Sequence, residues 1–494
     1  MNKFFLSVLS MLSIFTLDVF SQVLTTKYTL DEFISLAYKL SIDAVDARNT
    51  YITNCYKFID TKADNLPSLS FNATLPNFNR SITWNESTQN VINSNSLTNN
   101  VRLNLEQKVP LTGGTLSMSS YLEQITLFES HSPSSYLASP VSMSYAQPLF
   151  GFNIMKWVKK ISPIEFEIAQ RKYISALQAI TNSALDNFFE FKSAQEKLKA
   201  SEINYNNLDT LFKISNERLA YGTMNQNDVM QMEISLLKAK SNLISDKINL
   251  ATVNENLSNF FGLSDDNVIN FDLILPDTPP IKIIEYQNAY DVALKNNPEL
   301  LSEDIKILEA KRDLEQAKRE RFKIDLNVTF GLDHASTTIL PDMYKKPYDD
   351  RQQIQVSINA PIIDWGKQRR KIHLAVAKEE MANLQIKKAL LNFERDFSLD
   401  VLKFNSLDEA YSIAKKTDTL SIQRYEINKR RFLIGKIETE KLNDAIKEKT
   451  DARIKYIDML KSYWELYFSI QKKALYDFST NQSLISKYEN YLKP

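Results

Sequence analysis

The scarcity of helix-breaking residues is the feature that most constrains the fold of this chain. Glycine occurs only 8 times in 494 residues, against a usual share of about 7%. Two long stretches, from Pro163 to Pro276 and from Pro361 to Pro494, contain no proline between their end residues. Gly222 lies well inside the first stretch, and Gly435 lies well inside the second. Such stretches favour long helices that fold back on themselves near the internal glycine.

Apolar residues in these stretches repeat with the spacing of a coiled coil, which supports the same interpretation. One set in each stretch shares a helical face: Ile234, Leu237, Ile244, Ile248 and Ala251 in the first, and Ile446, Ile454, Ile457, Trp464 and Tyr467 in the second. Helical arms of roughly 50–60 residues would be about 80–90 Å long. That length exceeds a compact domain and suits a coiled-coil tube or stalk.

Between the helical stretches the apolar period changes to two, which predicts β-strands with one apolar and one polar face. Alternation is clearest over residues 69–75, 101–105, 141–145, 326–332 and 354–358. A further piece, 115–122, follows Gly113 and Gly114, which is a hairpin signal. The polar stretches 77–100 and 333–350 are expected to be loops in solvent.

The chain contains an internal repeat. Leu36-Ala37-Tyr38-Lys39 aligns with Val292-Ala293-Leu294-Lys295. Pro148-Leu149-Phe150 aligns with Pro361-Ile362-Ile363, and Arg218–Gly222 aligns with Arg431–Gly435 at the same offset. Because these anchors occur in one order, we expect each repeat to contain a helix, strands and a long helical hairpin.

These patterns define the expected domain boundaries. The first repeat takes residues 22–263, with strands at about 68–147 and a tip near 222. A proline-containing linker at 264–282 follows. The second repeat takes 283–480, with strands at about 324–360 and a tip near 435, and 481–494 form a C-terminal tail.

Residues 1–21 have the composition of a signal peptide. Lys3 precedes an apolar run from Phe4 to Phe20, and Val19-Phe20-Ser21 resembles a cleavage site. The alternative is a membrane anchor, although the run is shorter than the roughly 20 residues that a span needs. No cysteine follows the run, so a lipid anchor is not expected there. No later stretch would span a membrane as a helix, so we expect any entry into a membrane to occur through strands.

Composition argues against several other classes of protein. Lys+Arg and Asp+Glu are both 60, and this charge balance gives no reason to expect a nucleic-acid partner. Cys55 is the single cysteine, and there are three histidines. This inventory disfavours a disulfide framework and a multi-ligand metal site. Phosphate-binding glycine motifs are missing. We therefore expect no enzyme activity, no cofactor and no metal.

A few amphipathic strands per repeat cannot close a barrel within one chain. Two strands per repeat would give about four per chain, whereas a membrane barrel needs roughly eight or more. Three chains would supply twelve strands, and their long helices would form a second, helical tube. Polar strand faces would then line water and apolar faces would meet lipid. Such a protein would be a conduit.

At this point the chain resembles the TolC-like outer-membrane efflux proteins of Gram-negative bacteria. The duplicated layout, the strand-to-helix entries at Pro148-Leu149-Phe150 and Pro361-Ile362-Ile363, and the two tips carry the resemblance, which covers about residues 28–480. It implies an α+β membrane protein: a homotrimer with a twelve-stranded outer-membrane barrel and a periplasmic α-barrel. It also implies docking to a periplasmic adaptor and, through it, to an inner-membrane transporter. The hairpin at 111–125 departs from this pattern; we expect a cap, with eighteen barrel strands per trimer as the alternative.

The resemblance also implies which residues act at the periplasmic end. Arg218, Gly222, Arg431 and Gly435 occupy the tips, where the adaptor would dock. Asp228 and Asp444 match acidic gate positions of the family, whereas Lys441 replaces a further aspartate and Glu440 lies beside it. Phe432 and Ile437 stand where the family has a hydroxyl-bearing aromatic residue and a basic residue, so the family's hydrogen-bonded gate is not implied.

Two alternatives remain open from the sequence. Three copies of Asp444 around an axis would attract cations, but Asp228, Glu438, Glu440, Lys441 and Asp444 could equally form a solvated helix face. For the function, the alternative to a trimeric duct is an exported, non-conducting coiled-coil scaffold of the periplasm. The transported substrate is not indicated.

Overall fold

The computed structural model describes residues 27–85, 89–128, 134–263, 272–320, 323–336 and 347–492. The expected signal peptide and residues 264–271 of the expected linker lie outside this described part. The chain divides into two compact units. The helical unit takes the described residues up to Arg48, Ile174–Ala293 and Phe397–Ser486. The sheet unit takes Asn49–Tyr173, Leu294–Asp396 and the residues after Ser486.

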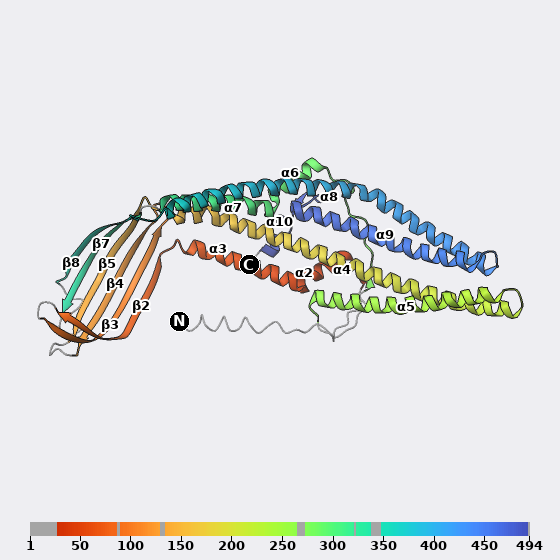
Figure 1. Cartoon of the computed structure of the whole chain (residues 1–494), viewed down its shortest axis with the longest axis horizontal. Helices are drawn as coiled ribbons and strands as arrows, with labels where there is room; N and C mark the ends of the chain where they lie inside the picture. The colour runs from red at the N-terminus through yellow and green to blue at the C-terminus, as the bar shows by residue number, and fades with distance from the viewer. Residues whose placement is uncertain are drawn as a thin grey trace. The chain divides into compact units, whose positions relative to one another are not determined.

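Two series of helices, one from each half of the chain, have the same order and the same lengths (Figure 1). Their lengths are 11, 22, 67 and 36 residues in both halves. The first series is α2 (Leu30–Leu40), α3 (Ile42–Ala63), α4 (Ile154–Ala220) and α5 (Gln226–Phe261); the second is α6 (Tyr286–Asn296), α7 (Pro298–Arg319), α8 (Lys367–Leu433) and α9 (Thr439–Ala474). The long helices of each series meet where the sequence predicts the tips.

Local capping explains where the long helices begin and end. The side chain of Asn225 accepts a hydrogen bond from the backbone N–H of Asp228, which caps the start of α5. Gly262 ends α5 with a φ of 68°, a left-handed conformation that glycine adopts without steric cost. Within the helical unit, Phe33 packs edge-on against Phe188 and Phe261, so these helices share an aromatic core.

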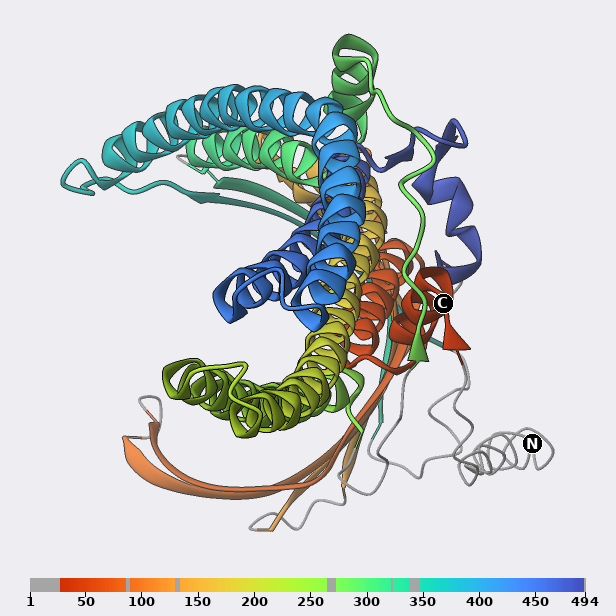
Figure 2. The ribbon, with the colours of Figure 1, turned by 90° about the vertical axis from the view of Figure 1, so that its right-hand side faces the viewer.

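The sheet unit contains six antiparallel strands in the order β2-β3-β4-β5-β7-β8. Their ribbons curve along their length (Figure 2). The strands are β2 (Ser68–Asn85), β3 (Asn90–Val109), β4 (Gly114–Leu127), β5 (Ser135–Leu149), β7 (Lys323–Ser336) and β8 (Asp349–Asn359). Short strands form two separate pairs: β1 (Lys27–Tyr28) with β6 (Asp272–Leu273), and β9 (Tyr476–Asp477) with β10 (Gln482–Ser483). The C-terminal tail holds α10 (Leu484–Lys487) and a 3-10 helix, η2 (Glu489–Leu492).

Two expectations about the strands need correction. The described part of the chain has six strands in one sheet rather than about four, because the 111–125 segment pairs with β3 and β5 instead of standing apart as a cap. Residues 77–85 and 90–100 are not a solvent loop, since they form much of β2 and β3, while residues 86–88 lie outside the described part. Asn79 pairs with Ser96 and Ser81 with Ser94: backbone hydrogen bonds hold these strands together whatever their side chains are.

The expected loop at 333–350 is also shorter than the sequence suggests. β7 continues to Ser336 and β8 begins at Asp349, while residues 337–346 lie outside the described part. None of the described helices combines the length and hydropathy needed to cross a membrane.

Candidate functional site: a two-faced sheet and two hairpin tips

One face of the six-stranded sheet is apolar. Residues that pair across an antiparallel ladder point to the same face, so the register identifies its rows. One row runs through Leu69, Leu105, Met118, Met143 and Phe330. These side chains are not covered by the chain itself: Leu69 is 71% exposed and Phe330 is 53% exposed. A continuous exposed apolar face of this kind requires a partner surface.

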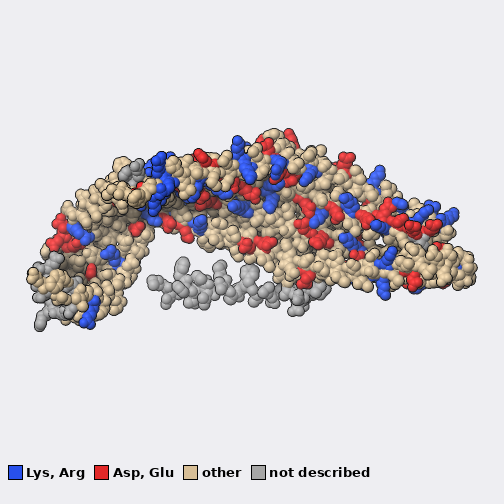
Figure 3. Space-filling model, viewed as in Figure 1, with Lys and Arg blue, Asp and Glu red and all other residues tan. Residues whose placement is uncertain are grey.

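The other face of the sheet is polar. Its neighbouring row contains Ser70, Asn104, Ser119 and Ser142, and ends at Gly331 and Arg351. Arg351 forms a salt bridge with Asp333 at 3.4 Å, and its guanidinium donates a hydrogen bond to the Oγ of Ser142 at 3.1 Å. Figure 3 shows few charged side chains over the visible strands and many of both signs over the helices. The sheet can therefore separate water from an apolar phase.

The two hairpin tips have the same backbone geometry. In the first, Gly222 has a φ of 67° and the N–H of Thr223 donates to the carbonyl oxygen of Arg218 at 2.9 Å. In the second, Gly435 has a φ of 75° and the N–H of Lys436 donates to the carbonyl oxygen of Arg431 at 2.9 Å. These are helix-ending turns in which a left-handed residue lets the chain reverse.

A side chain joins the two tips. Arg218 Nη2 donates a hydrogen bond to the carbonyl oxygen of Leu433 at 2.8 Å, so it satisfies a backbone acceptor at the end of α8 that the helix leaves free. Arg431, in contrast, is exposed at the surface of its own tip. The equivalent arginines of the two repeats therefore have different roles in this chain.

The acidic candidates lie on the helices that follow the tips. Asp228 is half-buried in the first turn of α5, while Glu440, Lys441 and Asp444 are exposed on α9. Among the described residues, no salt bridge joins Lys441 to Glu440 or Asp444. Asp444 lines a groove of about 820 Å³ between α8 and α9. Glu440, Lys441 and Asp444 thus lie within about one turn of each other on α9, whereas Asp228 lies on α5.

The two residues that the resemblance aligns with gate partners, Phe432 and Ile437, are packing residues in this chain. Phe432 is buried in an apolar cluster near the tips, and Ile437 packs against the same cluster. The cluster combines residues of α4, α5, α8 and α9, including Leu208, Met232 and Leu442. Apolar packing thus joins the two hairpins near their tips.

Sequence reasoning missed a polar cluster that links the hairpins. Asn207 Nδ2 donates a hydrogen bond to the Tyr425 hydroxyl at 2.9 Å, and Lys429 Nζ donates to Asn207 Oδ1 at 3.3 Å. Lys449 Nζ lies 4.2 Å from the centroid of the Tyr425 ring, within the range of a cation–π interaction. The only available signal was the i, i+4 spacing of Tyr425 and Lys429; nothing in the sequence identifies Asn207 as their partner.

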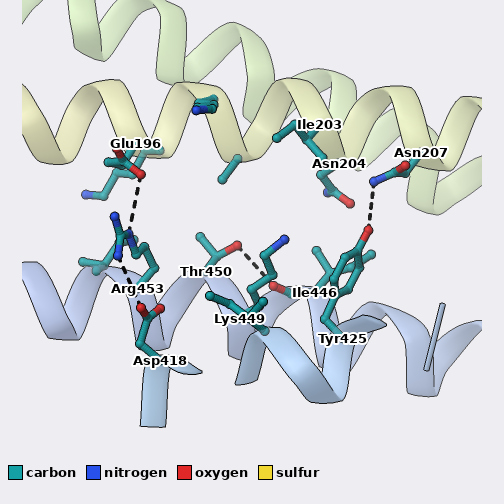
Figure 4. Close-up of a pocket in the computed structure, with 15 residues that line it drawn as sticks. Glu196, Ile203, Asn204, Asn207, Asp418, Tyr425, Ile446, Lys449, Thr450 and Arg453 are labelled. Carbon is teal, nitrogen blue, oxygen red and sulfur yellow. Dashed lines mark hydrogen bonds and ion pairs between the residues drawn. The ribbon is translucent and has the colours of Figure 1, made fainter. Parts of the chain in front are cut away.

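A cavity of about 340 Å³ lies beside this cluster, between α4, α8 and α9 (Figure 4). Arg453 forms salt bridges with Glu196 at 3.5 Å and with Asp418 at 3.3 Å across one end of the cavity. Tyr425 points toward Asn207 at the other end (Figure 4). The cavity therefore has ionic and hydrogen-bonded ends, and it is large enough for water.

Burial changes the pKa values of the two groups stacked in this cluster. It raises the pKa of the Tyr425 hydroxyl, with a smaller contribution from the charge of Glu426. Burial also lowers the pKa of the Lys449 ammonium, and the like charge of Lys429 acts in the same direction. Neutral tyrosine is favoured, and the cost of burying the lysine charge is partly offset by the ring.

In the part of the chain that the structure describes, no group of three or more His, Cys, Asp or Glu side chains is arranged to hold a metal ion. The described residues instead form the two faces of a sheet, two helix-ending turns and packing contacts between helices. This arrangement can separate water from an apolar phase, and it can bind other protein surfaces.

Comparisons with known proteins agree with this geometry. Residues 93–263 match the family model described as Outer membrane efflux protein. Over these residues the chain is similar to the outer membrane efflux proteins. The resemblance inferred from the sequence is thereby confirmed.

Solved structures of this group share its fold. The Campylobacter jejuni CmeC outer membrane channel aligns with a TM-score of 0.66 and 16% identity, over 94% of this chain and 89% of that one. The outer membrane protein VceC from Vibrio cholerae aligns with a TM-score of 0.61 and 11% identity, over 90% and 95% of the two chains. At these identities the likeness establishes the fold alone.

A curated relative gives a weaker but independent match. The Toxin and drug export protein A of Aggregatibacter actinomycetemcomitans is 18% identical over 249 residues, which cover 48% of this chain. The match spans about half, 51%, of that protein's length.

Proposed function

We propose that this chain is the outer-membrane channel of a tripartite efflux or type I secretion system. In this role it passes substrates from a periplasmic adaptor and an inner-membrane transporter to the exterior, and it performs no catalysis. The two-faced sheet is the observation that carries the proposal, because an exposed apolar face opposite a polar face suits a wall between lipid and water. The family match and the export role named for the curated relative support it.

Three copies are proposed to form the working channel, and unpartnered surfaces on the single chain support such assembly. β2 and β8 are the edge strands of the sheet, and open edges in a membrane must pair. On α5, Ile234, Leu237, Ile244 and Ile248 form an exposed stripe. On α8, Ile413, Leu420 and Ile427 form another at heptad spacing. We propose that the α5 stripe of one copy packs on the α8 stripe of the next, since a repeated contact of this type closes a ring.

The internal duplication and the repeat boundaries predicted from the sequence belong to the same proposal. Equal helix lengths in the two halves support them. The hairpin tips, with Arg218, Gly222, Arg431 and Gly435, are the proposed docking surface for the adaptor. Export by a signal peptide, without a lipid anchor, is part of the proposal as well.

Asp444 is the proposed centre of a gate, with Lys441, Glu440 and Asp228 nearby. Three copies of Asp444 around a narrow opening would favour cations. We therefore expect Asp444→Ala to weaken cation preference in single-channel recordings of the reconstituted trimer, while Asp458→Ala, an exposed residue on the same helix, leaves it unchanged. If the two variants behave alike, Asp444 belongs to a solvated helix face.

Two neighbouring substitutions on β8 test the membrane assignment. Val356 pairs with Leu326 on the apolar face, and Gln355 pairs with Asn327 on the polar face. An arginine facing lipid at mid-depth costs about 2–4 kcal/mol, whereas a lumen position tolerates charge. We expect Val356→Arg to reduce the amount of trimer recovered from outer membranes severely, and Gln355→Arg to assemble normally. Equal tolerance of both would remove the membrane assignment and favour the periplasmic scaffold.

A further inference from the structure

The two halves of the chain contribute unequal numbers of strands to one sheet. The first half supplies β2, β3, β4 and β5, whereas the second supplies β7 and β8. The long helices show no such difference, because each half supplies one of 67 and one of 36 residues. The extra strands therefore enlarge only the sheet.

We infer that all six strands of each chain enter the membrane wall, so that three copies close an eighteen-stranded barrel around a wide exit vestibule. This inference rests on the proposed function and on its three copies. It specifies which surfaces of neighbouring copies pair, namely β8 of one with β2 of the next. It also specifies which part of the conduit is wide.

Along the row through Leu105, the apolar face reaches the first strand. Leu69 and Phe71 on β2 pair with Leu105 and Leu103 on β3, and the row through Leu105 continues to Phe330 on β7. Phe71 is 66% exposed in the single chain. A cap standing in water would gain nothing from large apolar residues on one face and Ser70, Asn72 and Asn104 on the other. Lipid on one side explains both faces.

The turn between β3 and β4 is built into the end of the wall. Asn153 Nδ2 donates a hydrogen bond to the carbonyl oxygen of Pro110 at 2.9 Å, and Gln147 Nε2 donates to that of Thr112 at 2.9 Å. At Gly114 a Cβ atom would lie only 2.9 Å from the carbonyl oxygen of Ala146 on β5. The hairpin is thus fitted closely against β5 and does not stand away from it.

Strand direction permits closure. Every neighbouring pair from β2 to β8 is antiparallel. The first and last of the six strands, β2 and β8, therefore run in opposite directions. β8 of one copy would therefore run antiparallel to β2 of the next, and the alternation would continue around the ring. Closure would also remove both exposed edges.

Width follows from strand number, because barrel diameter grows roughly in proportion to it. Eighteen strands would give about 1.5 times the diameter and about 2.3 times the cross-section of twelve. At a spacing of about 4.8 Å and a tilt of about 40°, the backbone diameter is about 36 Å. The number of long helices does not increase together with the number of strands. The narrowest passage, which limits cargo size, therefore lies in the helical part.

Thiol labelling of outer-membrane vesicles from expressing cells tests whether β2 and β3 lie in the wall. Cys55, the single cysteine, is buried, and Cys55→Ala gives a background free of thiols. Single cysteines are then placed by Ser70→Cys and Phe71→Cys on β2, and by Asn104→Cys and Leu103→Cys on β3. Thr329→Cys and Phe330→Cys on β7 are the matched controls.

We expect a membrane-impermeant maleimide to label Ser70→Cys and Asn104→Cys at least tenfold faster than Phe71→Cys and Leu103→Cys, as on β7. A lipid-soluble maleimide should show the opposite preference. If the labelling rate differs between the two cysteines on β7, but the impermeant maleimide labels cysteines on both faces of β2 and β3, the hairpin lies outside the wall. That result would overturn this inference. If β7 does not alternate either, or no trimer forms, the proposed function itself fails.

Polymer exclusion from the barrel side gives a second measurement that needs no substitution. Polyethylene glycols of increasing size are added to that side of the reconstituted trimer while its conductance is recorded. We expect polymers to enter up to a size limit about 1.5 times that of a twelve-stranded channel measured in parallel. An equal limit for the two channels would contradict the eighteen-stranded vestibule.

Discussion

Arg453 is the residue on which the polar link between the hairpins depends most. It neutralises Glu196 and Asp418, and the side chain of Asp418 is only 10% exposed. Removing one partner of such a pair leaves a charge with little access to water. Arg453→Met should therefore destabilise the local packing of α4 and α8 by about 2 kcal/mol. Hydrogen–deuterium exchange at these helices would be about 30-fold faster.

A matched control comes from an exposed salt bridge that joins α8 and α9. Arg424 pairs with Glu448, and both side chains are largely in solvent. Arg424→Met should cost no more than about 0.5 kcal/mol. Adding Asp418→Asn to Arg453→Met should slow exchange again, because the buried charge is gone. Equal exchange in both single variants would mean that Arg453 is a surface charge like Arg424.

At this scale the sequence predicted conformations better than partnerships. Gly222 and Gly435 were predicted as tip residues, since only a left-handed residue reverses the chain there, and both have positive φ. The contact between Asn207 and Tyr425 could not be predicted. It joins residues that are far apart in the chain, and neither residue type demands a partner of that kind.

At the scale of single elements, helices were more predictable than strands. Long stretches free of proline and glycine leave few alternatives to a helix. β2 and β3 were harder to recognise, because their outer parts are rich in Asn and Ser, and Arg80 and a register irregularity between Thr74 and Asn77 interrupt the apolar alternation at Phe78, Ile82 and Trp84. Backbone pairing does not depend on apolar side chains, as the pairs Asn79 with Ser96 and Ser81 with Ser94 show. Composition therefore predicted a loop where pairing produces a hairpin.

The α5 stripe provides a test of assembly at the scale of one helix. Ile248 is 63% exposed in the single chain, and the proposed trimer would bury it against a neighbouring copy. A carboxylate at that position would have to be desolvated on assembly. We expect Ile248→Glu to shift the detergent-extracted protein from trimer toward monomer on size-exclusion chromatography with light scattering. Asn249→Glu, one residue along the same helix, should leave the trimer intact.

Failure of Ile248→Glu to change the mass would show that this stripe is not part of the contact between copies. A loss of trimer in both variants would instead point to general instability of α5. Circular dichroism separates these outcomes, because a specific effect on assembly leaves the helix content unchanged.

Across the whole chain, the helices of the two halves match in length while the strands do not. The sequence suggested a repeat through three short anchors, and the helix lengths of 67 and 36 residues in both halves support it. The additional hairpin of the first half changed the expected four strands to six. An internal repeat predicts only the elements that both halves share. The position of an inserted hairpin has to be determined from the strands with which it pairs.

The central claim is that this chain forms a trimeric conduit in the outer membrane. Separation of inner from outer membranes, followed by electrophoresis of the unheated, detergent-extracted protein, tests it most directly. The account predicts an outer-membrane protein that migrates as a trimer and dissociates to a single chain on heating. A soluble periplasmic protein with the mass of a monomer or dimer would contradict the claim and leave a coiled-coil scaffold as the better description.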